Sequence, residues 1–318
     1  RDLARISARI DWRRSFFLPG GIEGVILGEA TADAYRISED AVFNGKTTRS
    51  HGSVGVELRW PWVKATDSGV THVIEPVAQF IWAPSNFETL PNEDSVLVEF
   101  DEGGLFQLDR FPGSDAVERG PRANIGISWT RYDPNGWTLG VTLGRVYRNA
   151  DLGQFGPGSG LAGQQSDWLA ALSLDTGDGL GLTARAVFDQ NLTLTKGEAR
   201  LSLVRPKTTL SGSIIWAVAD PTENRPDPTQ EFALDAQRKF GPNWVGKLAG
   251  RYDFAADAGT VAGLGVEYMN ECVRFGVSLS RRFTSSTSVT PTTDFALSLD
   301  LIGFGSGASG GPARTCRQ

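Results

Sequence analysis

The chain has 318 residues, a net charge of −6 at pH 7, a pI near 5.1 and a mean hydropathy of −0.20. An acidic chain lacks the basic face that phosphate-backbone recognition needs, so no nucleic-acid partner is expected. No run of about 18 apolar residues occurs, which excludes a helical membrane protein. A transmembrane β-barrel escapes that test, because its lipid-facing and lumen-facing residues alternate.

Apolar residues alternate with small or polar residues in one segment after another. Ile125 and Ile127, for example, alternate with Gly126 and Ser128. Period-two alternation predicts strands with one apolar face. Many segments exceed the ~5–6 residues typical of soluble strands and reach the ~9–11 that a tilted membrane-spanning strand needs. In chain order, the predicted strands cover residues 1–13, 22–37, 51–62, 71–82, 122–132, 136–148, 166–175, 180–194, 197–205, 208–218, 231–239, 243–254, 259–270, 272–283 and 291–303.

Short turns and long links alternate between these strands, as they do in outer-membrane barrels. The short turns are rich in Pro, Gly, Asn and Asp, which are turn residues. The longer links cover residues 38–50, 83–121, 149–165, 219–230 and 284–290. We therefore predict an all-β fold, a transmembrane antiparallel β-barrel over residues 1–304. It carries a long surface loop at 83–121 and ends in a flexible tail at 305–318.

The two terminal strands point the same way on this pattern, which gives an odd count of about 15, whereas bacterial single-chain barrels have even counts. No signal peptide precedes Arg1, which already lies in an alternating strand. We therefore expect a partial barrel from a larger one.

Three stretches together resemble the LptD family, the outer-membrane component of lipopolysaccharide (LPS) export. They are the strand 72–80, a run in the acidic loop between residues 91 and 113, and the segment 280–284, with Tyr268 and Cys272 upstream. The residues that match the family's strand and loop motif are Glu75, Pro76, Gln79, Asn92, Asp94, Ser95, Leu105, Phe106, Asp109, Arg110 and Gly113.

The resemblance implies an outer-membrane barrel of about 26 strands, of which this chain would hold the C-terminal part. It implies LPS as the substrate, inserted into the outer leaflet through a seam between the first and last strands. The implied partners are an LptE-like lipoprotein plug, an LptA-like periplasmic bridge reached through an N-terminal domain, and the barrel-assembly machinery.

The last predicted strand would form one side of that seam. Its lumen face would carry Asp294, Ser298 and Asp300, and its lipid face would carry Phe295, Leu297, Leu299 and Leu301. An open strand edge is unfavourable in hydrocarbon, so a gate needs a weak seam rather than a permanent gap. An ordinary closing strand is the alternative.

The two cysteines, Cys272 and Cys316, are both predicted at the periplasmic rim, where disulfides persist. The family has an adjacent cysteine pair near this place, bonded to the N-terminal domain. Here Glu271 and Val273 flank Cys272, so the pair is not kept. A Cys272–Cys316 bond, bonds to partners outside this chain and free thiols all remain open.

Charged groups offer candidate contacts to LPS phosphates. Arg251, Arg274, Arg281 and Arg282 are expected to face the lumen, where they would bind phosphate or pair with acids such as Asp253 and Glu267. The acidic loop 83–121 is expected to cap the barrel mouth, to bridge Ca²⁺ and LPS phosphate at the surface, or to be a solvated loop. No resident cofactor or metal is expected.

Enzyme chemistry is not expected, because the chain has only two histidines and lacks a nucleophile-elbow motif. The main alternative to LPS transport is a porin or other passive channel, which would have a complete even-stranded barrel and a charged loop folded inward. A soluble β-sandwich is the third possibility, and it would fold without detergent.

Overall fold

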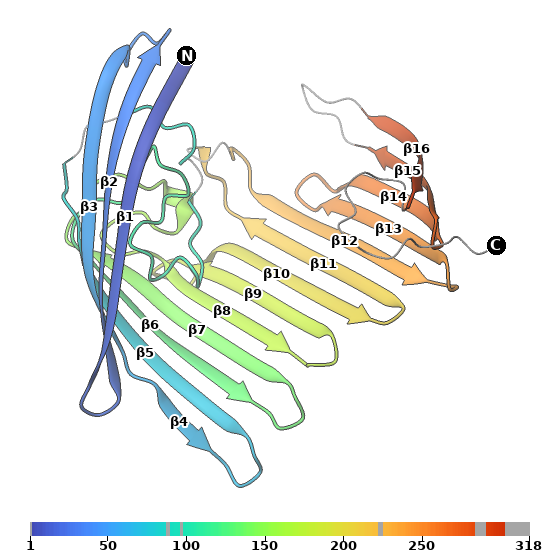
Figure 1. Ribbon diagram of the computed structural model, residues 1–318, viewed down its shortest axis with the longest axis horizontal. Helices are drawn as coiled ribbons and strands as arrows, with labels where there is room; N and C mark the ends of the chain where they lie inside the picture. The colour runs from blue at the N-terminus through green and yellow to red at the C-terminus, as the bar shows by residue number, and fades with distance from the viewer. Residues whose placement is uncertain (1, 87–89, 96–97, 222–224, 284–290, 303–318) are drawn as a thin grey trace. The chain divides into compact units, whose positions relative to one another are not determined.

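The computed structural model describes residues 2–86, 90–95, 98–221, 225–283 and 291–302 (Figure 1). Within them lies a 16-stranded sheet and one short 3-10 helix, η1 (Pro157–Ser159). The strands are β1 (Asp2–Leu18), β2 (Ile22–Ser38), β3 (Gly45–Arg59), β4 (Trp62–Ala65), β5 (Thr71–Trp82), β6 (Arg122–Tyr132), β7 (Thr138–Arg148), β8 (Trp168–Asp175), β9 (Leu180–Phe188), β10 (Leu194–Arg205), β11 (Thr208–Ala217), β12 (Thr229–Lys239), β13 (Trp244–Asp253), β14 (Ala258–Met269), β15 (Val273–Arg282) and β16 (Thr292–Leu301).

Strands follow one another in sequence order across the sheet, from β1 to β16. The exception is β4, which lies beyond the end of β3 and pairs with β5 alone in the described sheet. The ladders whose registers are described are antiparallel, as in β1–β2, β5–β6 and β15–β16. The all-β antiparallel prediction is confirmed. In the described part, no helix is long and apolar enough to cross a membrane, a finding that does not bear on crossing by strands.

The region around β3 differs from the prediction of one strand at 51–62. The strand begins earlier, at Gly45, and pairs there with Ile37 of β2. The polar segment 45–50 lacks an apolar face, so alternation could not reveal it as a strand. At the other end, β3 stops at Arg59 and β4 starts at Trp62, and both pair with β5. The predicted loop 38–50 is therefore much shorter than expected.

Pro76 lies in the middle of β5, opposite this break. The carbonyl of Pro76 accepts a hydrogen bond from the backbone N–H of Trp60, at 3.1 Å. In an antiparallel strand the N–H and C=O of one residue point to the same side. The donor that proline lacks would therefore point at residues 60–61, which lie between β3 and β4 and belong to neither strand. Pro76 is tolerated because it faces this gap in the ladder.

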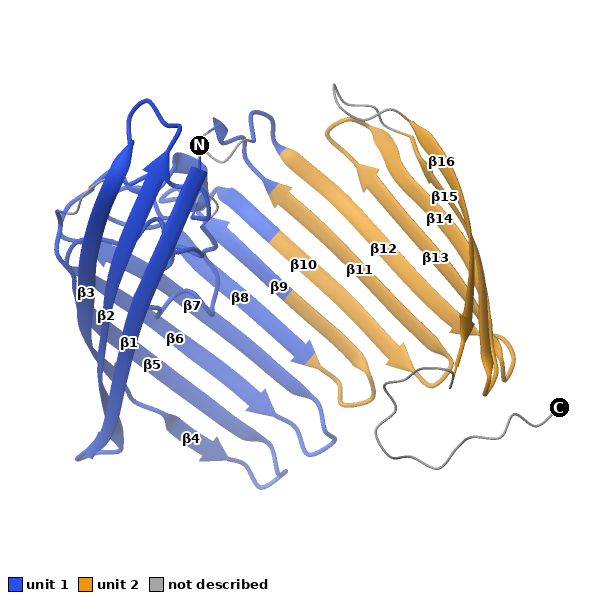
Figure 2. Ribbon diagram, turned by 45° about the horizontal axis from the view of Figure 1, so that its top comes forward, with its two compact units in different colours: residues 1–174, 184–197, 217–228 blue, residues 175–183, 198–216, 229–318 orange. Residues whose placement is uncertain are grey.

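The chain divides into two compact units, coloured separately in Figure 2. Unit 1 comprises residues 1–174, 184–197 and 217–228, and unit 2 comprises residues 175–183, 198–216 and 229–318. In unit 1 one face of the sheet is covered by the long loop, and the other face exposes Ile26, Val54, Val56, Phe80, Trp82, Ile125 and Ile127. In unit 2 the exposed apolar side chains include Leu248, Leu264, Leu279, Phe295 and Leu297. Within each unit, apolar side chains exposed on neighbouring strands are the kind of surface that contacts a partner or a membrane.

Candidate functional site

The loop 83–121 packs on one face of the unit 1 sheet and has an apolar core of its own (Figure 1). Val98, Phe100 and Leu105 of the loop cluster with side chains from the neighbouring strands and from the link before β8. These partners are Val146, Leu161, Leu169 and Val187. Leu105 and Leu161 are fully buried. The loop is therefore a folded element and not the solvated segment that its acidic composition allowed.

Two glycines in the strands make room for the loop. Gly126 of β6 and Gly144 of β7 are register partners, so they lie side by side on the covered face. A Cβ added at Gly144 would collide with the Cδ2 atom of Leu105, and one added at Gly126 would lie 2.9 Å from Phe106 and 3.0 Å from Leu105. Because the two glycines lack side chains, Leu105 and Phe106 of the loop can pack directly against the backbone of β6 and β7.

A buried amide network joins the loop to the strands beneath it. The Nε2 of Gln79 donates to the Oε2 of Glu57 and to the backbone carbonyl of Phe106, both at 2.8 Å. The Nδ2 of Asn124 donates to the Oε1 of Gln79 at 2.6 Å. Gln79 and Asn124 are fully buried register partners of β5 and β6. Removing one member would leave its buried partners unsatisfied, so the network fixes the position of the loop.

Glu118 lies at the centre of three arginines, and all four side chains are buried. Its carboxylate is 2.6 Å from Arg110 of the loop, 3.1 Å from Arg148 of β7 and 3.5 Å from Arg122 of β6. Burial would raise the pKa of Glu118, but the three guanidinium groups outweigh it and lower the pKa to about 2. The cluster therefore ties the loop to two strands with a carboxylate that stays ionised.

Carboxylates also hold the turns within the loop. Asp94 accepts hydrogen bonds from the backbone N–H groups of Ser114 and Asp115 and from the hydroxyl of Ser95. Burial would raise its pKa, but these donors and the Arg5 guanidinium lower it to about 2. A Cβ at Gly113 would collide with Asp94, so only glycine fits beside this carboxylate.

Asp109 differs from the other two loop carboxylates. It accepts the backbone N–H groups of Phe111 at 3.0 Å and Glu118 at 3.1 Å. No ion pair involves Asp109 within the described ranges. Burial raises the pKa of Asp109 to about 6, although the two N–H donors lower it and the charge of Glu118 raises it. Its carboxyl therefore titrates close to neutral pH.

Asp109→Asn is expected to stabilise the protein at pH 7 by on the order of 1 kcal/mol and to change little at pH 4. The folded-state pKa of about 6 lies above the ordinary value of 3.8. As pH rises between these values, the unfolded chain releases a proton that the folded loop keeps, so stability falls. Asparagine removes that loss and can still accept both N–H bonds.

The measurement is the urea midpoint of the detergent-solubilised protein at pH 4 and pH 7. Asp151→Asn, in an exposed turn, is the matched control and should behave like the unchanged protein. Equal destabilisation of Asp109→Asn at both pH values would contradict the prediction.

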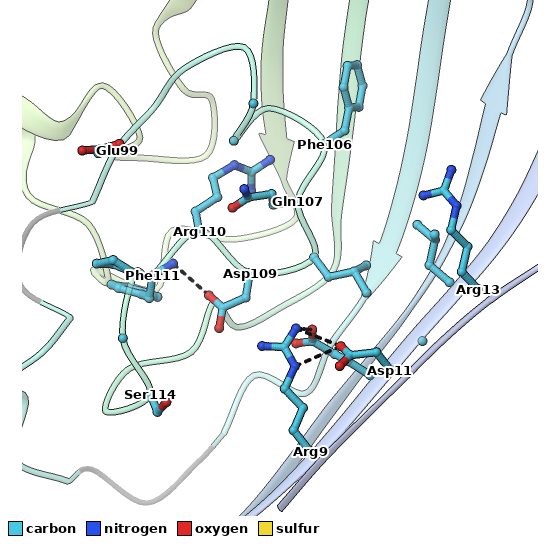
Figure 3. A pocket seen from close by; sticks show the side chains of 18 of the residues that line it. Arg9, Asp11, Arg13, Glu99, Phe106, Gln107, Asp109, Arg110, Phe111 and Ser114 are labelled. Atoms are coloured by element: carbon cyan, nitrogen blue, oxygen red, sulfur yellow. Dashed lines mark hydrogen bonds and ion pairs between the residues drawn. The ribbon is translucent and has the colours of Figure 1, made fainter. Parts of the chain in front are cut away.

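A polar cavity of about 920 Å³ separates the loop from the hairpin of β1 and β2 (Figure 3). Arg9 and Arg13 line it from β1, and Asp101, Gln107 and Asp109 line it from the loop. In the described part of the loop, ion pairs to the hairpin involve Arg5, which lies 2.7 Å from Asp115 and 3.3 Å from Asp94. The loop is thus anchored by buried contacts to β3, β5, β6 and β7 and by more exposed pairs to β1.

Most residues of the predicted strand and loop motif come together in this assembly. Gln79, Leu105, Phe106, Arg110, Asp94, Ser95, Asp109 and Gly113 make the contacts described above. Asn92 exchanges hydrogen bonds with the backbone of Ser95, and Glu75 pairs with Arg59 at 2.9 Å. The sequence did not single out Glu57, Glu118, Arg122, Asn124 or Arg148. Alternation placed Asn124 on a polar face, but only the folded loop reveals its partners.

The predicted seam residues lie in β16, which pairs with β15. Asp294, Ser298 and Asp300 lie opposite Ser280, Gly276 and Arg274, and the apolar set alternates with them. Leu297 and Leu299 are 62% and 65% exposed. The assignment of these faces to lumen and lipid stays a prediction.

One of the four predicted phosphate-contacting arginines does not share a face with the others of its strand. Arg281 and Arg282 are successive residues of β15 without a bulge between them, so they point to opposite faces. Arg281 lies on the side of Phe275 and Leu279, with its guanidinium 5.2 Å from the ring of Phe283. Grouping it with Arg274 and Arg282 on one face was wrong.

The acids expected to pair with these arginines have other partners. Glu267 pairs with Lys247 at 2.8 Å, and Asp253 accepts backbone N–H groups of the turn after β13. Arg274 donates to the sulfur of Met269 at 3.6 Å, and Arg251 lies in β13 between Ala233 and Val261. Contact of Arg251, Arg274 and Arg282 with phosphate stays a prediction.

Cys272 is disulfide-bonded and lies in the turn before β15. Cys316 lies outside the described residues, and so does the tail 305–318. The described residues contain no group of three or more His, Cys, Asp and Glu side chains placed to hold a metal ion. Calcium bridging through LPS stays a prediction.

Long antiparallel strands with an exposed apolar face, opposite a face that carries a polar folded loop, fit the class of outer-membrane β-barrel proteins. The chain belongs to the LptD family, because the family model described as "LPS transport system D" matches residues 1–244. The family is one of LPS transport and is not a family of enzymes.

Two further comparisons add little to this assignment. No curated protein matches the chain. Among solved structures, a multiply substituted mutant of the Rh. blastica porin is 12% identical, with a TM-score of 0.29. The alignment covers 91% of this chain and 99% of the porin chain. Another mutant of that porin is 13% identical, with a TM-score of 0.27, and covers 86% and 95%. At these TM-scores the likeness carries no conclusion about function.

Proposed function

We propose that this chain is part of the outer-membrane LPS translocon and inserts LPS into the outer leaflet through a lateral seam in which β16 forms one side. The observation that carries the proposal is the family match together with the edge position of β16. Within the described sheet order, β16 pairs with β15 and with no second strand. Its alternating polar and apolar residues suit a strand that meets a saccharide on one face and acyl chains on the other.

The partners of this transport are proposed on the same basis. An LptA-like periplasmic bridge delivers LPS through an N-terminal domain, an LptE-like lipoprotein occupies part of the lumen, and the barrel-assembly machinery inserts the protein. Nothing in the site suggests a bound nucleotide, and the driving force is expected to come from elsewhere in the pathway.

Photo-crosslinking in cells that make the full-length parent protein tests the proposal. A photoreactive residue at Ser298 or Asp300 is expected to form LPS adducts that depend on the upstream export machinery. Leu299, between them on the opposite face, is the matched control. Adducts only at Leu299, or adducts that persist without the upstream machinery, would mean that the barrel is merely surrounded by LPS.

A passive channel is the second candidate, and the packing of loop 83–121 onto the strands favours it. Porins narrow their lumen with an inward-folded charged loop, and this loop is charged and packed on the covered face of the sheet. Conductance of the full-length parent in planar bilayers separates the two functions. Steady, open conductance with no LPS adducts at Ser298 or Asp300 would favour the channel.

A further inference from the structure

The cavity between hairpin β1–β2 and loop 83–121 lies apart from most of the contacts that hold the loop in place. Gln79 of β5, Arg122 of β6 and Arg148 of β7 bind the loop and do not line the cavity. The cavity lies on another side of the loop, and its volume of about 920 Å³ falls in the range of ligand sites, ~300–1,000 Å³. Figure 3 shows charged side chains approaching it from both walls.

Some of these charges are satisfied within the hairpin. Arg9 lies 3.0 Å from Glu29 and 2.8 Å from Asp11, so its positive charge is offset by these two carboxylates. Arg13 forms a longer ion pair, 3.5 Å from Glu57, and its side chain is 55% exposed. Guanidinium N–H groups of Arg13 can therefore donate to a ligand in the cavity. The hairpin thus offers hydrogen-bond donors with little net charge.

The loop wall offers acceptors and an amide. Among the described residues Asp109 accepts two backbone N–H groups and forms no ion pair, and the side chain of Gln107 is exposed in the cavity lining. Carboxylates outnumber arginines in the lining, and Arg110 is already paired with Glu118. The cavity therefore presents donors on one side and acceptors on the other, with an excess of acid.

The donors and acceptors that line the cavity favour some parts of an LPS molecule as its ligand and disfavour others. An acyl chain would leave the charged groups of the lining without partners, which is unfavourable. A phosphate would meet an excess of carboxylates, and like charges repel. A hydroxyl group both donates and accepts, so it can bond to Arg13 and to Asp109. We infer that this cavity is a subsite for a hydroxyl-rich saccharide, the oligosaccharide part of LPS. The inference rests on the proposed transport function.

Isothermal titration of the full-length parent protein in detergent, with lipid-free LPS core oligosaccharide as the probe, tests the subsite. Gln107→Trp narrows the cavity and is expected to weaken saccharide binding by about tenfold or more, a loss of about 1.4 kcal/mol. Arg13→Gln removes donors and is expected to weaken binding severalfold. Arg14→Gln is the matched control, because Arg14 is the exposed neighbour of Arg13 on β1, points to the opposite face and does not line the cavity.

Several outcomes would overturn the subsite. They are no saccharide binding to the unchanged protein, equal weakening by Arg14→Gln, full competition by inorganic phosphate, and preferential binding of a lysine-rich peptide. Heat-shifted gel mobility of each variant confirms folding. LPS adducts at Ser298 and Asp300, measured in parallel, report on transport itself. If the unchanged protein forms LPS adducts but does not bind the saccharide, the subsite alone is rejected. If the unchanged protein forms no LPS adducts at Ser298 and Asp300, the proposed function is rejected.

Discussion

Glu118→Ala is expected to destabilise the folded protein by about 3–5 kcal/mol and to release loop 83–121 from its strands. The substitution leaves Arg110, Arg122 and Arg148 buried without their common carboxylate. Buried charges without a partner are strongly unfavourable, so the strands and the loop must separate or admit water. The expected readouts are a lower urea midpoint and a lower temperature for the loss of the compact gel band.

Glu102→Gln is the matched control for that variant. Glu102 belongs to the same loop and pairs with Arg185 at 3.1 Å, but the two side chains are 41% and 38% exposed. Exposed ion pairs contribute little, so the control should lose less than about 1 kcal/mol. If both variants lose the same stability, the buried cluster is not what anchors the loop.

The Glu118 carboxylate also makes the stability of the folded protein depend on pH in the acid range. The pKa of Glu118 falls from 4.5 to about 2 in the folded protein, and that of Asp94 from 3.8 to about 2. Their stabilisation is complete above the ordinary values and is lost as pH falls from there toward 2. The slope of stability against pH between 4.5 and 2 should be shallower in Glu118→Gln than in the unchanged protein.

The second large loss of stability is expected from substitutions at the contact between Leu105 and Gly144. Leu105→Ala removes a fully buried side chain and should cost about 2–5 kcal/mol. Gly144→Ala places a methyl group where the Cδ2 atom of Leu105 lies, and overpacking of this kind costs about 1–3 kcal/mol. In the double variant the new methyl group fills part of the space that Leu105 has left.

The double variant is therefore expected to be more stable than the sum of the two single losses predicts, by about 0.5–3 kcal/mol. Urea unfolding of all four proteins in one detergent gives this coupling energy. Gly136→Ala is unsuitable as a control, because Gly136 has a φ of +88°. Gly250→Ala serves instead, since nothing lies within 4 Å of its added Cβ. Strict additivity of Gly144→Ala and Leu105→Ala would show that the loop does not rest on this glycine.

The strands were largely predictable because their signal is local. In β6, Ile125 and Ile127 alternate with small and polar residues, and the predicted range 122–132 is the range observed. The start of β3 was not predictable in this way, since residues 45–50 are polar throughout and become a strand only by pairing with β2. The break between β3 and β4 was not predicted, and its consequence for Pro76 depends on which residues lie opposite in the ladder.

The loop shows the same division. Its motif residues could be recognised from their resemblance to the LptD family, and the structure brings most of them together. Of the Glu118 cluster only Arg110 belonged to that motif. Glu118, Arg122 and Arg148 carried no such signal, because Arg122 and Arg148 lie far apart in the sequence and only the pairing of β6 with β7 makes them neighbours. The error over Arg281 has a simpler origin, since strand geometry alone separates it from Arg282.

By itself, the sequence determined the all-β antiparallel architecture, most strand boundaries and the LptD family, because alternation and short motifs are properties of consecutive residues. The tertiary structure decided that the acidic loop is folded, that Glu118 and Gln79 anchor it, and that a polar cavity remains beside β1. These features depend on desolvation and on contacts between residues far apart in the chain, and no local pattern encodes either of them.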